Sequence, residues 1–71
     1  MRKITTVEQI RELAQDHFDE YNDNDIDKVE LFNRLHYPLW LCANRFVQTN
    51  NTSFTDLSAD ILGLIQDIEH A

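Results

Sequence analysis

Only one glycine, Gly63, and one proline, Pro38, occur in this 71-residue chain. A fold of many short strands needs turn residues at roughly every eight to twelve positions, and this chain cannot supply them. Helices need far fewer turns, and apolar residues recur at three- and four-residue steps through most of the sequence. The sequence therefore predicts an all-α protein, a compact bundle of three to four short helices that forms a single domain over residues 1–71.

The first predicted helix covers residues 6–21. Thr5 and Glu8 have the spacing of a capping box, in which a threonine oxygen accepts from a free helix N–H and the glutamate reaches back. At about 100° per residue, apolar side chains then occupy one side of the helix and acids the opposite side. The apolar side consists of Val7, Ile10, Leu13, Ala14, Phe18 and Tyr21. This pattern is typical of a helix that packs on a core.

Pro38 divides the next part of the chain. The polar run 22–25 predicts a tight turn whose Asn and Asp side chains can cap the following helix. Proline inside a helix costs about 3 kcal/mol or more, because it removes a hydrogen bond and clashes with the preceding turn. We therefore expect one helix to end near His36 and another to cover residues 38–48. A single helix kinked at Pro38 is the alternative.

The segment 38–48 is apolar on most sides, as expected for a central helix, and we expect Trp40 to anchor the core. Ser53, with Asp56 three residues later, predicts the cap of a last helix that runs to about His70. Some apolar residues fall outside the predicted stripes of their helices, namely Leu31, Leu41 and Leu62. They are either further core residues or an exposed contact surface.

Acids outnumber bases by thirteen to six, which gives a formal net charge of −7. Such a charge repels phosphate, so we expect no direct binding of nucleic acid. One cysteine excludes an intramolecular disulfide and a cysteine-rich zinc site. No apolar run approaches the roughly 20 residues of a membrane span, and the N-terminus has no signal-peptide core, so we expect a cytoplasmic protein that does not contact membranes.

No residue pattern indicates catalysis or a cofactor. His17, His36 and His70 have the positions of packing or helix-end residues, and Cys42 lies on the most apolar segment. We therefore expect neither an enzyme nor a bound cofactor.

A calcium loop is a weak alternative for the acids that follow the first helix. With Asp19 at the first position of an EF-hand loop, Asp23, Asp27 and Glu30 stand at the fifth, ninth and twelfth positions, but Tyr21 replaces a ligand and Asn24 replaces the turn glycine. We expect no metal site.

The acids themselves are the candidate functional residues. They form a line along the first helix and a second group on the last helix, and no base follows Arg45. A rigid helix that carries carboxylates can occupy the Lys/Arg groove with which another protein binds DNA. The candidate partner-binding residues are Glu12, Asp16, Asp19, Glu20, Asp23, Asp27, Asp56, Asp60 and Asp67.

Two functions remain open on this evidence. The first is a small acidic inhibitor or modulator that acts as a DNA mimic against a basic, nucleic-acid-processing protein, as antirestriction and anti-CRISPR inhibitors do. The alternative is a structural or regulatory interaction module, with a homodimer as one form, which binds through apolar helix faces and keeps its acids for solubility.

Overall fold

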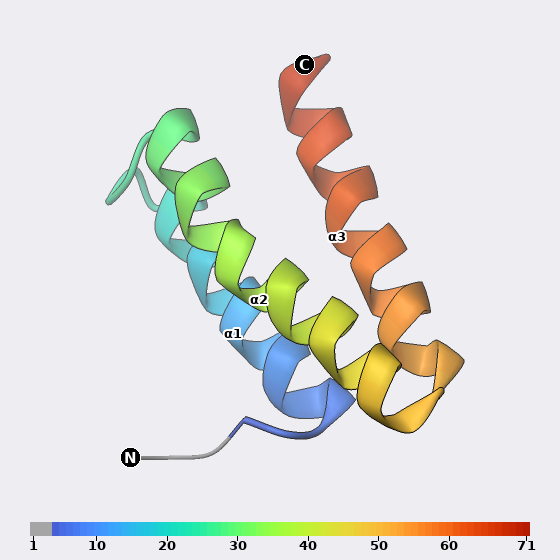
Figure 1. The fold of residues 1–71 in the computed structure, drawn as a ribbon. Helices are drawn as coiled ribbons and strands as arrows, with labels where there is room; N and C mark the ends of the chain where they lie inside the picture. The colour runs from blue at the N-terminus through green and yellow to red at the C-terminus, as the bar shows by residue number, and fades with distance from the viewer. Residues whose placement is uncertain (1–3) are drawn as a thin grey trace.

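A computed structural model describes residues 4–71 of the chain, which form three α-helices and contain no strand. The helices are α1 (Val7–Asn22), α2 (Lys28–Thr49) and α3 (Thr52–Glu69). They run up, down and up again, with α2 packed against both of the others (Figure 1). The prediction of an all-α, compact bundle is confirmed, and the number of helices is three.

The expected break at Pro38 is wrong, because α2 continues through this residue. Pro38 is buried, and the residues on the inner side of α2 follow one another at steps of three and four: Leu31, Leu35, Pro38 and Cys42. The proline ring is thus part of the apolar stripe. Burial of this stripe on both sides of Pro38 offsets the cost of a proline inside a helix, which is about 3 kcal/mol or more for the lost hydrogen bond and the clash with the preceding turn together.

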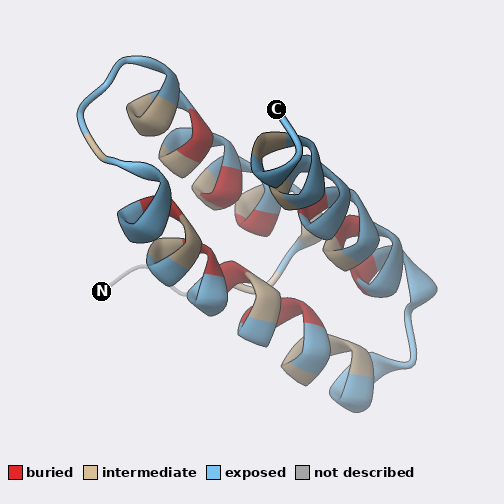
Figure 2. Ribbon diagram, turned by 90° about the horizontal axis from the view of Figure 1, so that it is seen from above, coloured by how far each residue is buried: buried red, intermediate tan, exposed pale blue. Residues whose placement is uncertain are grey.

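Continuity of α2 changes which residues face the core. Trp40 is 58% exposed and Val47 is 78% exposed, so the expectation that Trp40 anchors the core is wrong. Leu31 and Leu41 are buried, whereas Leu62 is exposed. In Figure 2 the buried positions line the inner sides of the helices. The buried apolar residues are Ile10, Ala14, Phe18, Leu31, Leu35, Leu41, Cys42, Phe54, Leu57 and Ile61.

The N-cap of α1 lies one residue later than predicted. Thr6 is the N-cap: its hydroxyl accepts from Gln9 N–H (3.2 Å), and Gln9 Oε1 accepts from Thr6 N–H (3.1 Å). A second backbone donor, Thr5 N–H, reaches the same glutamine oxygen at 2.8 Å. The capping box therefore exists, with Thr6 and Gln9 in place of Thr5 and Glu8.

Each of the two connections, residues 23–27 and 50–51, contains an asparagine in the left-handed conformation. Asn24 and Asn50 have φ of 64° and 56°, in the left-handed region that asparagine tolerates better than most residues. The helix α2 is capped by Asp27, not by residues 23–25, and the carboxylate of Asp27 accepts from Glu30 N–H at 2.8 Å. Short polar side chains thus replace glycine at both turns.

The cap of α3 is also displaced from its predicted position. Asn51 Oδ1 accepts from Ser53 N–H at 3.0 Å, so Asn51, not Ser53, starts the helix. An asparagine at the N-cap accepts from one of the free N–H groups of the first turn, as a serine would. Asn51, two residues before Ser53, therefore takes this role.

The two halves of α3 differ in packing. Phe54, Leu57 and Ile61 are buried, but Leu64 is 46% exposed and Ile68 is only partly buried. In Figure 1 the C-terminal half of α3 stands apart from the N-terminal half of α2. The first half of α3 therefore holds this helix on the bundle, and apolar side chains of the second half remain open to water.

Gly63 lies in the interior of α3, and a Cβ added there would meet no atom within 4 Å. Glycine in a helix costs about 0.5–1 kcal/mol relative to alanine. We therefore expect Gly63→Ala to raise the melting temperature by several degrees in a thermal circular-dichroism scan. The exposed Ala59 of the same helix provides the control, because Ala59→Gly should lower it by a similar amount. A decrease for Gly63→Ala would show that α3 is not a regular helix at this position.

Candidate functional site

The outer side of α1 carries a line of exposed carboxylates. Glu12, Asp16, Asp19 and Asp23 are all exposed, and they extend along about 16 Å of helix axis at 1.5 Å per residue. Asp19 accepts a hydrogen bond from Gln15 Nε2 at 3.0 Å. The others have no side-chain partner among the described residues, so their charges are directed to water.

The structure brings the acids of α3 beside this line. Asp60 lies 3.9 Å from the guanidinium of Arg11, and both side chains are more than half exposed. Asp67 shares a surface depression with Gln15 and Asn22 of α1. We use "acidic face" for seven of the exposed carboxylates on and next to these two helices: Glu12, Asp16, Asp19, Asp23, Asp56, Asp60 and Asp67.

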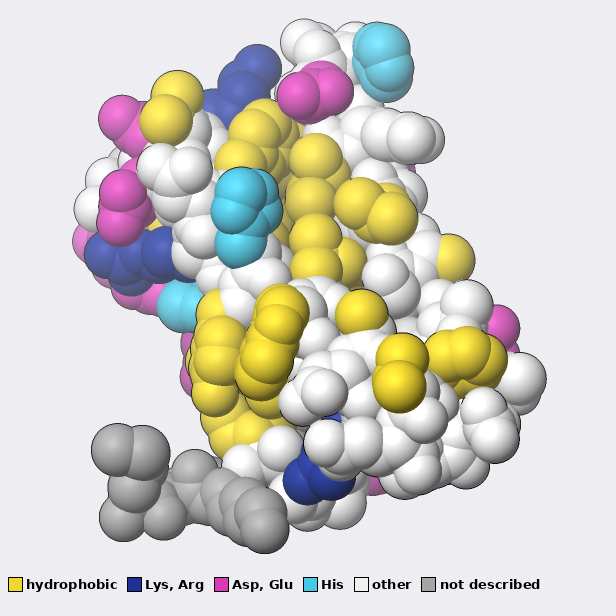
Figure 3. Space-filling model, in the orientation of Figure 1, with side chains coloured by type: hydrophobic (Ala, Val, Ile, Leu, Met, Phe, Trp, Pro, Cys, Tyr) yellow, Lys and Arg dark blue, Asp and Glu magenta, His cyan; other side chains and the backbone are white. Residues whose placement is uncertain are grey.

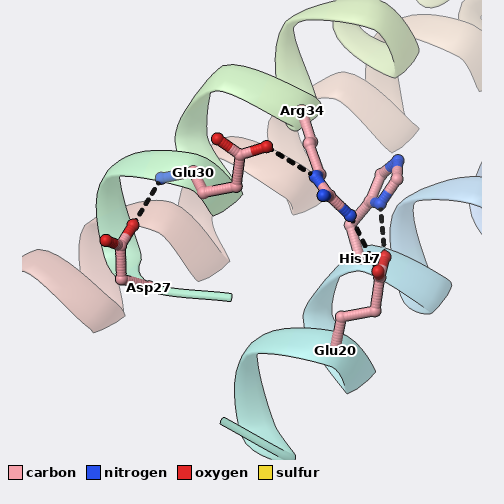
Figure 4. Close-up of polar contacts among 5 residues, drawn as sticks. All are labelled: His17, Glu20, Asp27, Glu30 and Arg34. Carbon is pink, nitrogen blue, oxygen red and sulfur yellow. Dashed lines mark hydrogen bonds and ion pairs between the residues drawn. The ribbon is translucent and has the colours of Figure 1, made fainter. Parts of the chain in front are cut away.

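Two of the predicted partner-binding residues, Glu20 and Asp27, also have local structural roles. Glu20 accepts from Arg34 Nη1 at 2.7 Å and from His17 Nδ1 at 2.9 Å, and Arg34 Nε donates to Glu30 at 2.9 Å (Figure 4). Arg34 thus joins α1 to α2. The hydrogen bond from His17 and the charge of Arg34 lower the pKa of Glu20 below its ordinary value. Asp27 caps α2, as described above.

An apolar surface lies on the outer side of α2. The rings of Tyr37 and Trp40 stack at a centroid distance of 6.3 Å and an interplanar angle of 13°. By helical arithmetic at about 100° per residue, no charged residue of α2 lies within about 60° of Trp40. We call this surface the aromatic strip; it consists of Val29, Tyr37, Trp40 and Val47, all of them at least half exposed. Figure 3 shows exposed apolar side chains along α2 and in the seam between α2 and α3.

An open groove of about 390 Å³ lies between the C-terminal halves of α1 and α3. Its apolar side chains are Phe18 and Tyr21 of α1 and Leu64 and Ile68 of α3. Gln15, Asn22 and Asp67 supply the polar part of the lining. A smaller hollow of about 50 Å³ continues along the same seam and reaches Arg11 and Asp60. The sequence did not indicate this groove, because it depends on how far apart α1 and α3 lie.

Two further kinds of site can be assessed from the structure, a metal site and the thiol of Cys42. Within residues 4–71, no three His, Cys, Asp or Glu side chains are grouped closely enough to hold a metal ion. Asp19 and Tyr21, which an EF-hand would place in its loop, are helical residues of α1. Cys42 is buried, and burial raises the pKa of its thiol, which disfavours the nucleophilic thiolate.

No helix in the described part of the chain is long and apolar enough to cross a bilayer. No protein-family model, curated protein or solved structure matches the chain.

Proposed function

We propose that this protein is a non-catalytic, protein-binding protein that contacts a basic partner through the acidic face. The observation that carries the proposal is the placement of exposed carboxylates on two adjacent helices, with Arg11 as the base that lies among them. Such a surface accelerates encounters with positively charged proteins and repels acidic ones. The mode of action is stoichiometric contact.

The spacing of the carboxylates supports a partner that normally binds nucleic acid. Along α1 they are separated by about 5 Å on average, at 1.5 Å of rise per residue. One strand of duplex DNA carries a phosphate about every 3.4 Å. The neighbouring acids of α3 increase the charge density of this surface. A groove of Lys and Arg side chains that fits a phosphate backbone would therefore also attract the acidic face, and the bound protein would inhibit by blocking that groove.

Removal of the charges on α1 tests this proposal. We expect Glu12→Gln, Asp16→Asn, Asp19→Asn and Asp23→Asn together to weaken binding of a basic partner at least tenfold, a loss of about 1.4 kcal/mol. Stability should be unchanged or slightly higher, because like charges one turn apart on a helix repel by a few tenths of a kcal/mol per pair. Glu20 is left intact because it joins α1 to α2.

A control variant separates the acidic face from net charge. Asp25→Lys with Glu69→Lys shifts the net charge by the same four units, but both residues are exposed positions outside the acidic face. Immobilised parent, test variant and control variant are incubated with a nuclease-treated cell extract, and captured proteins are quantified by mass spectrometry at low and high salt. Basic proteins that bind the parent and the control, but not the test variant, support the proposal. Equal capture by all three would contradict it.

The aromatic strip favours a second candidate function, an interaction module that binds through an apolar helix face. Tryptophan and tyrosine are enriched among the residues that dominate binding energies at interfaces, and Trp40 exposes more than half of its surface. Apolar binding would persist at high salt, whereas binding by the acidic face would weaken as salt rises. Proteins captured at high salt by the parent but not by Trp40→Ala would place this function first.

A further inference from the structure

The groove between α1 and α3 lies within the acidic face. Asp67 belongs to its lining, and Asp60 lies two turns earlier on the same side of α3. On the α1 side, Gln15 lines the groove and is held by Asp19 through the 3.0 Å hydrogen bond. The residues that line the wider part include no Lys or Arg. An apolar hollow is thus bordered by carboxylates on both helices.

The apolar lining of this groove is incompletely covered by the protein itself. Leu64 is 46% exposed, Tyr21 and Ile68 are partly buried, and Phe18 forms the buried floor. The seam between two helices accepts side chains of a third helix as ridges that fit into grooves. A helix laid along this seam would bury Leu64 and Ile68 and would extend the three-helix bundle by one helix.

The charges around the groove determine what such a helix must carry. Its apolar side chains would enter the hollow, and its flanking side chains would lie near Asp19 on one side and near Asp60 and Asp67 on the other. Lys or Arg at these flanking positions would pair with the carboxylates. A second copy of this chain is disfavoured as the occupant, because each copy has a net charge of −7 and would bring further carboxylates to the rim.

We propose that the groove binds a cationic amphipathic helix of the partner protein, with Leu64 as the central apolar contact. This inference rests on the proposed function and adds to it: the acidic face attracts the partner, and the groove selects a segment that has an apolar stripe as well as positive charge. Helices that dock in this way place anchors at steps of three and four residues.

The probe is a fluorescently labelled 14-residue peptide of leucine and lysine with its leucines on one helical side. A peptide of the same composition in scrambled order has equal charge but no apolar stripe. Leu64→Lys is the test variant. Leu62→Lys is its matched control, because Leu62 lies on the same helix, is 47% exposed and does not line the groove. Binding is measured by fluorescence anisotropy, and circular-dichroism melting checks that both variants are folded; Leu64→Gln serves as a neutral second variant.

We expect the amphipathic peptide to bind the parent at least about tenfold more tightly than the scrambled one. Only the amphipathic peptide can place several leucines in the groove at once, and a few such apolar contacts dominate the binding energy of an interface. Leu64→Lys should abolish most of this preference, Leu64→Gln should reduce it, and Leu62→Lys should retain it. Equal affinity of the two peptides, or equal losses of affinity in Leu64→Lys and Leu62→Lys, would overturn the proposal that the groove binds a helix. Such a result would still be consistent with binding by charge alone. If the preference survives neutralisation of Glu12, Asp16, Asp19 and Asp23 with no loss of affinity, the cationic character of the helix and the proposed function are both overturned.

Discussion

Leu35→Ala is expected to lower the free energy of unfolding by about 2–5 kcal/mol, whereas Trp40→Ala should change it by at most about 1 kcal/mol. Leu35 is completely buried at the centre of α2. Truncation of a buried leucine costs about 2–5 kcal/mol, through lost burial and the cavity that is left. At 0.05–0.15 kcal/mol per residue, a domain of this length has about 4–10 kcal/mol in total. The expected loss is therefore a large part of the whole.

Trp40 provides the contrast, because it is larger than Leu35 but lies on the outer side of α2. Its ring stacks on Tyr37, and its truncation removes that contact and some partly covered surface. Urea denaturation followed by circular dichroism at 222 nm, where the signal of the helical backbone dominates, measures both variants. If Trp40→Ala unfolds the protein and Leu35→Ala does not, then α2 is broken at Pro38 and its second half is rotated.

Hydrogen exchange is expected to divide α3 into a protected and an unprotected half. Residues 57–61 belong to the part that is held by Phe54, Leu57 and Ile61, so their amides should exchange only through global unfolding. Residues 65–69 belong to the half whose apolar side chains are partly open to water, and their amides should exchange through local fraying. The difference in protection should be about a hundredfold or more.

Two-dimensional NMR of the protein transferred into D₂O measures these rates residue by residue. The same experiment with the amphipathic peptide bound offers a second comparison, since a helix in the groove should slow exchange of residues 65–69 and leave residues 57–61 unchanged. Uniform protection along free α3 would show that the second half of the helix is packed as firmly as the first.

Local sequence patterns were sufficient to predict the helices, except where two local rules compete. The apolar spacing of α1 and α3 identified both helices to within a few residues, because each has one stripe and polar ends. At Pro38 two patterns gave opposite predictions: proline favours a break in the helix, whereas the apolar stripe favours its continuation. The structure has a continuous helix, as the stripe predicts. The error in the exposure of Trp40 follows from that choice, since it depends on how the stripe is continued across residues 36–39.

The candidate site was predictable only in part, for a similar reason. Exposure of the acids on α1 follows from helical arithmetic and is seen in the structure. The engagement of Glu20 by Arg34 does not follow from it, because these residues are 14 positions apart and meet only when α1 packs on α2. The groove lined by Phe18 and Leu64 likewise arises from the distance between two helices, which no local pattern specifies.

The short connections between the helices have a kinetic consequence. Residues 23–27 and 50–51 join each helix to the one that packs beside it, so most tertiary contacts form between neighbours in the sequence. Chains with such local topology fold within microseconds to milliseconds, because little loop entropy is lost before the contacts that compensate for it are made. A newly synthesised copy would therefore form its acidic face soon after α3 has left the ribosome, without a long-lived intermediate.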